Sequence, residues 1–594
     1  MTIKYYTIPV ISHFRREIKD MKALYYLALV LLALQPPAQA NPVAPSAAQD
    51  AARGQLVDAL FAAWNRPDSP GAAVLVVQDG QISYRGNFGM ADIEQGRAIT
   101  SFTPIHVASL SKQFTAFAIL LLAQEGKLSL DDDVRKYVPE LPEFGQTIRI
   151  RHLLSHTSGL RDQWNLLAMA GWRMDDVITD EDVMRLVRRQ RALNFAPGSD
   201  FAYNNTGYTL LAAIVRNVAG KPLAAFARER IFEPLGMRHT VFHEQYGTLV
   251  ARRARSYQPA PAGGYASVAL SYSTVGPSNL LTTAEDLLLW ANNFDDARVG
   301  GPALLAQMQT SATFNDGTPT AYGGGVEVGT YRGLKSIDHS GADAGFRSYL
   351  AYFPQQRLTI IVAANGADVQ AGRLGQRIAD IYLAGQLEPL PKPVPDYSDG
   401  VQVSLAPARL DALLGTYALE NGSAITFARE QGQLFGWTAG DEKMQFYPAS
   451  EREFFVKLSN ASFRFDAPDA AGVIGSGTWL RNARAVRARR LAPARLSGQE
   501  LQPLLGEYYS DELHALYTVT AKEGSVVLGY ARGDVALAPF GKQRFVGPWP
   551  FGLVTFQCMA SKPCAGFTVT ESRANEVAFT RVALTGAAGN TAVP

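Results

Sequence analysis

The sequence predicts an α+β domain followed by two small all-β, barrel-like domains, and three observations support this fold class. Strand-like segments stand at both ends of residues 50–387 and enclose a helical middle. A proline-rich linker follows at 388–400, and helical periodicity is lost beyond it. A short motif then occurs twice, which divides the remainder into modules at 401–493 and 494–585. One antiparallel sheet flanked by helices, with a helical lobe inserted between its two halves, accounts for the first domain.

The N-terminus has the pattern of a secretory leader. Met21 and Lys22 precede an apolar run at 23–34, and the small residues that end at Ala40 match an A-x-A cleavage site. Residues 1–40 are therefore predicted to be a signal peptide cleaved after Ala40, with Met21 favoured as the true start. The run is shorter than the about 20 residues that cross a bilayer. We expect no stable membrane span and a periplasmic or secreted protein.

The composition excludes several classes of protein. Lys and Arg number 56 against 54 Asp and Glu, so the net charge is only +2, and no basic tail points to a nucleic-acid partner. Two histidine pairs have the i,i+4 spacing of metal ligands, His152 with His156 and His239 with His243, but no third ligand and no H-E-x-x-H motif accompanies them. We therefore expect structural histidines, no metal and no cofactor. Cys558 and Cys564 lie close together in a chain predicted to enter an oxidising compartment. We expect them to form a local disulfide.

The first domain opens with a hairpin and a helix. The hairpin is predicted at 71–88, where Asp79-Gly80 forms a tight-turn pair between two apolar runs. A helix is predicted at 109–124, and Gly126 ends it. Further helical signals lie across 150–300, including the segment 209–219 before Gly220 and a capping box from Thr282 to Glu285.

Strand character then returns and closes the domain. The predicted strands are 323–328, 334–338, 346–353 and 358–363, and an amphipathic helix is predicted at 373–384. Because these strands lie beyond the helical middle, they are expected to complete the sheet begun by the first hairpin.

The C-terminal part of the chain repeats itself. The sequence Leu-Leu-Gly-Thr-Tyr at 413–417 returns as Leu-Leu-Gly-Glu-Tyr at 504–508, 91 residues later. Each copy runs through short alternating strands with Gly turns to a final Arg-containing strand. This pattern predicts two β-barrel or sandwich modules of about 90 residues.

A candidate nucleophile and base stand at the start of the helix predicted from Ser109. Lys112 follows three residues later, so one helical turn places both side chains on the same face. A serine hydroxyl needs a neighbour that takes its proton, and a partly desolvated lysine can be that base or can assist one. The helix N-terminus also favours developing negative charge.

Two further motifs carry groups that suit acyl transfer. Tyr203 and Asn205 lie in a loop just before a helix, and a phenol beside an ammonium group can act in proton transfer while an amide grips a substrate carbonyl. His339-Ser340-Gly341 lies on a predicted strand at the edge of the cleft, where glycine permits close approach of a ligand. The N–H group of Ala342 can then pair with that of the nucleophile as an oxyanion hole.

In this order and on these element types, the three motifs resemble the signature motifs of serine β-lactamases and penicillin-binding proteins. Three neighbouring runs resemble the group of class C β-lactamases, D-alanyl-D-alanine carboxypeptidases and D-aminopeptidases: His156-Thr157-Ser158-Gly159-Leu160, Glu233-Pro234-Leu235-Gly236-Met237 and Gly345-Phe346. The resemblance covers residues 55–385 and implies a β-lactamase/transpeptidase-like fold.

The resemblance also implies residue roles. It implies that Ser109 is the acylated nucleophile and that Lys112 and Tyr203 transfer its proton. It implies that the substrate contacts are Asn205, His339 and Gly341, with the backbone N–H groups of Ser109 and Ala342 as the oxyanion hole.

The third motif departs from the commonest pattern, because most β-lactamases of this fold carry Lys at the place of His339. A lysine is a permanent cation that draws in a substrate carboxylate, whereas histidine is mostly neutral at pH 7. This difference argues against efficient β-lactam hydrolysis. The D-aminopeptidases are also the relatives with two β-barrels after the hydrolase domain.

Three hypotheses follow for the function. The first is a secreted serine hydrolase that forms an acyl-enzyme on Ser109 with D-amino-acid-containing peptides or amides, including cell-wall-derived ones. The second is an esterase or β-lactamase of the same fold. The third is a non-catalytic penicillin-binding or cell-wall-binding sensor. The partner in each case is a small molecule or peptide, and the sequence carries no signal for an oligomeric state.

Overall fold

The computed structural model describes residues 47–260, 262–389, 403–420, 424–430, 432–438, 443–456, 461–481, 484–491, 496–522, 524–559 and 562–582. The predicted signal peptide and nearly all of the predicted proline-rich linker lie outside these residues, so both stay predictions. In the described part of the chain no single helix has the length and apolarity to cross a membrane, although the bent pair Asn205–Ala219 and Leu223–Leu235 meets that test together.

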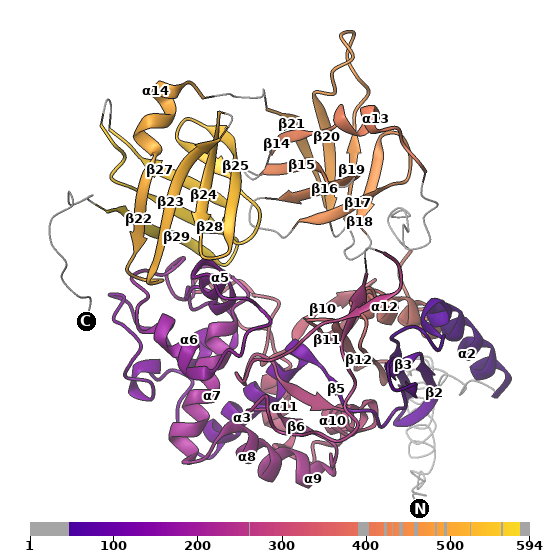
Figure 1. Cartoon of the computed structure of the whole chain (residues 1–594). Helices are drawn as coiled ribbons and strands as arrows, with labels where there is room; N and C mark the ends of the chain where they lie inside the picture. The colour runs from indigo at the N-terminus through magenta and orange to yellow at the C-terminus, as the bar shows by residue number, and fades with distance from the viewer. Residues whose placement is uncertain are drawn as a thin grey trace, which may run out of the picture. The chain divides into compact units, whose positions relative to one another are not determined.

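The first domain, indigo to magenta in Figure 1, is built on one antiparallel sheet. Its strand order is β10-β11-β12-β13-β1-β2. Its strands are β1 (Ala72–Gln78), β2 (Gln81–Phe88), β10 (Glu327–Tyr331), β11 (Leu334–Asp343), β12 (Phe346–Phe353) and β13 (Leu358–Ala364). Strand β1 pairs with β13 along its whole length, from Ala72 opposite Ala364 to Gln78 opposite Leu358. This pairing joins the two ends of the domain and confirms the predicted sheet.

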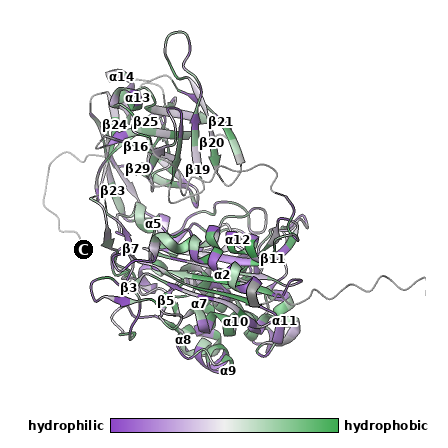
Figure 2. Ribbon diagram, turned by 90° about the vertical axis from the view of Figure 1, so that its right-hand side faces the viewer, coloured by the Kyte–Doolittle hydropathy of each residue, from purple (hydrophilic) through white to green (hydrophobic). Residues whose placement is uncertain are grey.

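Both faces of this sheet are buried, because successive side chains of β1 point alternately into two different hydrophobic cores. Residues Ala73, Leu75 and Val77 belong to one core, and Ala72, Val74 and Val76 belong to a second core. Helices α2 (Ala47–Phe61) and α12 (Ala371–Tyr382) supply the second core through residues such as Phe61 and Ile378. Helices α3 (Ser111–Gln124) and α10 (Ala284–Asp296) supply the first. Figure 2 shows this layering as hydrophobic residues along the sheet.

The helical lobe surrounds α3, whose residues 111–122 are all buried. Helix α7 (Asn205–Ala219) packs against α3. Its N-cap Asn204 accepts a hydrogen bond from the N–H of Gly207, and Gly220 ends it at a φ of 68°, as the sequence predicts. The other helices are α4 (Ile150–Leu154), α5 (Gln163–Met169), α6 (Asp180–Val187), α8 (Leu223–Ala227), α9 (Glu233–Leu235) and α11 (Gly301–Met308).

Short strands outside the main sheet form three small antiparallel sheets. They are β3 (Met90–Asp92) with β4 (Arg97–Ala98); β5 (Ile105–His106) with β9 (Leu280–Thr282) and β6 (Val241–Phe242); and β7 (Tyr257–Pro259) with β8 (Tyr265–Ser267).

The strand predicted at 323–328 begins later than the sequence indicates. The N–H of Gly323 donates to the carbonyl oxygen of Val326, and Gly325 has a φ of 76°, so these residues form a turn and β10 starts at Glu327. A Cβ on Gly325 would lie 2.5 Å from the carbonyl oxygen of Lys112. The glycine-rich segment therefore serves close packing against α3, not strand pairing.

The helix cap predicted at Thr282 is also displaced by one residue. Thr282 ends strand β9, and the hydroxyl of Thr283 instead accepts the N–H of Asp286 at 3.1 Å. The pattern of Thr followed by acidic residues identified the helix start but not which of two adjacent threonines caps it.

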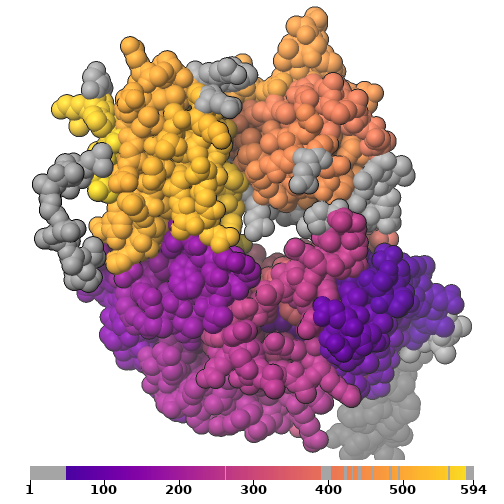
Figure 3. Space-filling view, in the orientation of Figure 1, coloured from indigo at the N-terminus to yellow at the C-terminus, as the bar shows by residue number. Residues whose placement is uncertain are grey.

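Two closed barrels of eight antiparallel strands follow, coloured orange and yellow in Figures 1 and 3. Helix α13 (Pro407–Asp411) precedes the first, which comprises β14 (Gly415–Leu419), β15 (Ala424–Glu430), β16 (Gln433–Thr438), β17 (Met444–Pro448), β18 (Glu453–Val456), β19 (Ala461–Phe465), β20 (Ser476–Arg481) and β21 (Arg484–Arg490). Helix α14 (Gly498–Leu501) precedes the second, which comprises β22 (Gly506–Ser510), β23 (Ala515–Lys522), β24 (Ser525–Tyr530), β25 (Gly533–Gly541), β26 (Arg544–Val546), β27 (Leu553–Gln557), β28 (Gly566–Glu571) and β29 (Ala574–Arg581).

The sequence repeat corresponds to a repeated structural device. Arg490 at the end of the first barrel lies over the ring of Tyr417 and donates to the carbonyl oxygens of Ala412 and Leu414. Arg581, 91 residues later, lies over Tyr508 in the same way. The final arginine therefore ties the last strand of each barrel to the chain that enters its first strand.

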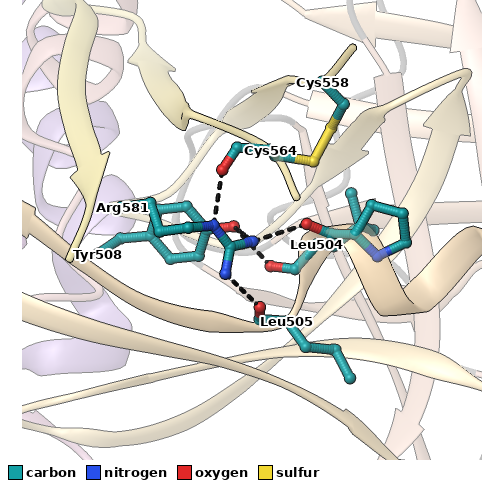
Figure 4. The surroundings of a disulfide bond; sticks show 7 residues. Leu504, Leu505, Tyr508, Cys558, Cys564 and Arg581 are labelled. Atoms are coloured by element: carbon teal, nitrogen blue, oxygen red, sulfur yellow. Dashed lines mark hydrogen bonds between the residues drawn. A yellow bond between two sulfur atoms is a disulfide. The ribbon is translucent and has the colours of Figure 1, made fainter. Parts of the chain in front are cut away.

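In the second barrel this device adjoins a disulfide between Cys558 and Cys564 (Figure 4). Arg581 donates to the carbonyl oxygens of Cys564 and Leu505, at 2.7 and 2.6 Å. The bridge closes the segment between β27 and β28, where the sequence predicts it.

The second barrel is joined to the helical lobe by buried polar contacts. Arg161 Nη1 donates to both carboxylate oxygens of Glu512, at 2.6 and 2.5 Å, and these side chains are only 3% and 5% exposed. The hydroxyl of Tyr517 donates to the carbonyl oxygen of Met169 at 2.5 Å. Apolar residues of the lobe and of this barrel also belong to one continuous core.

Candidate active site

Ser109 and Lys112 meet at the entry to the central helix. Ser109 lies in a 3-10 turn, Ala108–Leu110, that leads directly into α3, so Lys112 projects from the same side one turn later. Lys112 Nζ lies 3.1 Å from Ser109 Oγ. The structure thus brings the predicted nucleophile and base into hydrogen-bond contact.

The surroundings of Lys112 suit a proton acceptor. Its side chain is fully buried, and Nζ also donates to Oδ1 of Asn205 at 2.9 Å and to the carbonyl oxygen of Pro277 at 2.8 Å. Burial lowers the pKa of Lys112 to about 7, so the uncharged amine is well populated at neutral pH. In the uncharged amine, the two N–H groups donate to Asn205 Oδ1 and to the carbonyl oxygen of Pro277. The nitrogen lone pair is then free to accept the hydroxyl proton of Ser109.

The turn that carries Ser109 is strained and pressed against strand β11. Ala108 has a φ of 49°, in the left-handed region that a residue with a Cβ rarely adopts. Ser348 Oγ donates to the carbonyl oxygen of Val107 at 2.7 Å. A Cβ on Gly341 would lie 2.3 Å from that same carbonyl oxygen. The glycine therefore lets β11 approach the nucleophile's own turn.

This close approach bears on the predicted oxyanion hole. The position of a Cβ on Gly341 lies 3.2 Å from the Cβ of Ala108, so the backbone that carries Ala342 runs beside the backbone that carries Ser109. The joint action of these two N–H groups on an oxyanion stays a prediction.

Tyr203 lies beside the pair with its hydroxyl unengaged. Tyr203 Oη is buried and has no hydrogen-bond partner among the described residues, and its ring centre lies 4.7 Å from Lys112 Nζ. Burial raises the pKa of Tyr203 well above its usual range. This increase is larger than the decrease that the neighbouring Ser109 side chain causes in the same pKa. The phenol is therefore protonated at neutral pH and is suited to donate a proton, while Lys112 is suited to accept one.

Asn205 is held in place by Asp162. The carboxylate oxygen Oδ2 of Asp162 accepts the backbone N–H of Asn205 at 2.7 Å and its side-chain Nδ2 at 2.9 Å. The other oxygen accepts the N–H of Trp164 at the start of α5. This fixes the amide so that its oxygen points to Lys112. Asn205 thus positions the base, and its predicted contact with substrate stays a prediction.

His339 is buried beside Tyr203, with 6.1 Å between the two ring centres. Its side chain is 2% exposed, Nε2 lies 2.9 Å from the hydroxyl of Tyr322, and Nδ1 lies 2.6 Å from the carbonyl oxygen of Ser340. Burial, together with the charge of Lys112, lowers the pKa of His339 to about 3, so the ring is neutral. Both ring nitrogens are engaged, and the direct substrate contact predicted for His339 stays a prediction.

His156 supports the loop that carries Tyr203. Its Nδ1 accepts the backbone N–H of Asn204 at 3.0 Å, and its ring centre lies 4.3 Å from that of Tyr203. Burial holds the pKa of His156 well below its usual value. Within the described residues no group of three or more His, Cys, Asp or Glu side chains is arranged to hold a metal ion.

Three further residues lie at this site without having been predicted from the sequence: Asp162, Tyr322 and Arg573. Asp162 follows the run at 156–160 by two positions, so a capping aspartate before α5 was the available signal. Tyr322 precedes a glycine-rich turn and carries no signal by itself. Arg573 lies in the turn between β28 and β29, and its guanidinium carbon is 5.2 Å from the ring centre of Tyr203. Nothing local in the sequence links that turn to Tyr203, because 370 residues separate them.

Known proteins are similar to this chain in sequence or in fold. Penicillin-binding protein 4* of Bacillus subtilis is 28% identical over 412 residues, which cover 66% of this chain and 89% of that protein. A D-aminopeptidase of Brucella melitensis is 27% identical over 483 residues, which cover 81% and 86% of the two chains. The octameric penicillin-binding protein homologue from Pyrococcus abyssi has the same fold, with a TM-score of 0.52, 21% identity and coverage of 82% of this chain and 99% of that one.

The family described as Beta-lactamase matches residues 55–383, more than half of the chain. The matched segment contains the sheet, the helical lobe and the contact between Ser109 and Lys112. The chain is accordingly a serine hydrolase that belongs to the β-lactamase family.

Proposed function

We propose that this protein is secreted and hydrolyses D-amino-acid-containing peptides or amides through an acyl-enzyme on Ser109. The observation that carries the proposal is the buried Lys112 amine, 3.1 Å from Ser109 Oγ, with a pKa lowered to about 7. The similarity to D-aminopeptidases supports the substrate class.

In the acylation step the neutral amine of Lys112 takes the proton of Ser109, and Oγ attacks the carbonyl carbon of the substrate. The carbonyl π electrons move to oxygen, where the N–H groups of Ser109 and Ala342 stabilise the negative charge. The oxyanion then re-forms the carbonyl and expels the amine. Burial keeps Tyr203 protonated, so its hydroxyl donates a proton to the leaving nitrogen. The Lys112 ammonium then returns a proton to Tyr203.

In the deacylation step the same groups act on water. Lys112, again neutral, takes a proton from a water molecule while the oxygen of that water attacks the carbonyl carbon of the acyl-enzyme ester. The tetrahedral intermediate collapses, the bond to Ser109 Oγ breaks, and the proton returns to Oγ. The products are a carboxylic acid and the free enzyme.

A substrate panel on the purified full chain tests this proposal. The panel contains D-amino-acid amides, D-alanyl peptides, their L-enantiomers, p-nitrophenyl esters and nitrocefin. We expect hydrolysis of the D-compounds, with kcat/KM above that for the L-compounds, and loss of turnover in Ser109→Ala. Turnover of esters alone would favour an esterase, preference for nitrocefin a β-lactamase, and stable acylation without product release a penicillin-binding sensor. Each of these results would contradict the proposed substrate class.

Export is supported by the disulfide between Cys558 and Cys564, since such bonds persist in oxidising compartments. N-terminal sequencing of the protein recovered from its natural host outside the cytoplasm should give Asn41 as the first residue. A chain that keeps its first forty residues and stays in the cytoplasm would contradict export.

A further inference from the structure

The turn between β28 and β29 brings an arginine from the second barrel to the catalytic residues. The guanidinium carbon of Arg573 lies 5.2 Å from the ring centre of Tyr203. Lys112 Nζ lies 4.7 Å from the centre of the same ring. A residue of the C-terminal barrel and the candidate general base therefore contact one aromatic side chain.

The backbone at this position is fixed to the lobe. The carbonyl oxygen of Arg573 accepts the N–H of Asp162 at 2.9 Å and the Nδ2 of Asn194 at 3.0 Å. Asn194 Oδ1 in turn accepts the N–H of Asn575 at 2.8 Å. Asp162 is the residue that holds Asn205 against Lys112, so the turn is tied to the hydrogen-bonded chain of the active site.

In the described part of the chain, the one carboxylate of its own turn on which the charge of Arg573 acts is Glu571. Burial raises the pKa of Glu571 to about 7 while Arg573 lowers it, and the two side chains form no ion pair. The side chain of Arg573 is partly exposed, and among the described residues no Asp or Glu oxygen lies in ion-pair contact with the guanidinium. Both oxygens of Asp162 are taken by Trp164 and Asn205. The charge is nevertheless felt at the site, because Arg573 lowers the pKa of Lys112 and that of His156.

The other basic side chains of the site are engaged within the protein. Lys112 is buried and its three hydrogen-bonding positions face Ser109, Asn205 and Pro277. His339 is kept neutral by burial, and both of its nitrogens are engaged. Among the described residues whose charges shift the pKa of Lys112, Asp162 and Asp343 raise it and Arg573 lowers it.

We propose that Arg573 binds a carboxylate of the substrate, so that the enzyme selects D-amino-acid-containing peptides with a free carboxylate over the corresponding amides. A guanidinium presents a planar fork of N–H donors that matches a carboxylate. The second barrel thus contributes a specificity-determining residue to the hydrolase domain. The inference rests on the proposed function and narrows its substrate class.

The test compares two ligands that differ only in charge, N-acetyl-D-alanyl-D-alanine and its C-terminal amide. Their affinities are measured by calorimetry on the full chain with Ser109→Ala, which cannot cleave either ligand by the proposed route. A charge-assisted hydrogen bond predicts that the acid binds about tenfold or more tightly than the amide. Adding Arg573→Gln should bring this ratio close to one, and Arg573→Lys should retain part of it.

Arg544 provides the matched control, because it is an exposed arginine of the same barrel that lies 5.1 Å from the ring centre of Phe540. Arg544→Gln should leave the ratio of affinities unchanged. Equal binding of acid and amide, binding of neither, or a preference that survives Arg573→Gln would overturn the assignment of Arg573. The proposed function fails separately, if the protein with Ser109 intact hydrolyses none of the D-amino-acid amides and D-alanyl peptides of the substrate panel.

Discussion

Asp162 accepts both the backbone N–H and the side-chain N–H of Asn205 through one carboxylate oxygen, at 2.7 and 2.9 Å. The second contact turns the amide oxygen of Asn205 toward Lys112 Nζ, 2.9 Å away. A residue that contacts neither the nucleophile nor the base therefore sets the position of the base.

Asp162→Asn should lower kcat by on the order of 10²-fold, because misplacement of a catalytic group costs about that much. The negative charge of Asp162 raises the pKa of Lys112, so its removal should also move the acid limb of the pH–rate profile to lower pH. Kinetics from pH 5 to 9 measure both effects. Asp286→Asn is the control, since Asp286 is a buried carboxylate that accepts hydrogen bonds from His239 and Thr240 outside the site. A fall in activity with no shift of the limb would assign Asp162 a purely structural role.

The rate of ester hydrolysis should rise with pH through about 7, as the ammonium of Lys112 loses its proton and becomes a base. Lys112→Arg should abolish this limb and reduce kcat by at least about 10²-fold, because a guanidinium stays charged at every accessible pH. A profile of kcat/KM against pH for each protein is the measurement. A flat profile between pH 5.5 and 8.5 would show that another group is the base.

Tyr203→Phe should lower kcat by about 10²-fold while the fold is retained, because only an unpaired hydroxyl is removed from a packed ring. The loss should be larger for an amide than for a p-nitrophenyl ester, whose leaving group departs without a proton. Tyr265→Phe, which breaks a hydrogen bond to Asp368 outside the site, is expected to leave both rates unchanged. Equal losses on the two substrates would contradict a role in protonating the leaving group.

Glu512→Ala should lower the free energy of unfolding by about 3 to 5 kcal/mol, because it leaves the buried guanidinium of Arg161 without its counter-charge. Denaturant titration measures the change. Glu430→Ala removes an exposed pair with Lys443 and should change stability by less than about 1 kcal/mol. A small effect of Glu512→Ala would mean that the second barrel does not depend on this contact for its attachment.

Local sequence patterns predicted the parts of the structure that local interactions determine. The hairpin at β1 and β2 follows from its turn, where Asp79 and Gly80 have φ angles of 50° and 75°. The contact between Ser109 and Lys112 follows from one helical turn. The barrel repeat was visible because a tyrosine and a final arginine perform the same task twice.

Contacts between distant segments could not be predicted from the pattern. Asp162 meets Asn205 only after α5 and α7 pack together, and Arg573 reaches Tyr203 only because the second barrel docks on the lobe. The glycine-rich run before β10 illustrates the same limit, because its turn is dictated by the backbone of Lys112, to which it packs.

We assign Ser109 as the nucleophile and Lys112 as the group that activates it. Intact-mass spectrometry of the full chain after incubation with a fluorophosphonate tests this assignment most directly, followed by peptide mapping of the adduct. We predict one adduct per chain, located on Ser109, absent from Ser109→Ala and formed far more slowly by Lys112→Arg. An adduct of the same mass on Ser109→Ala would show that Ser109 is not the nucleophile.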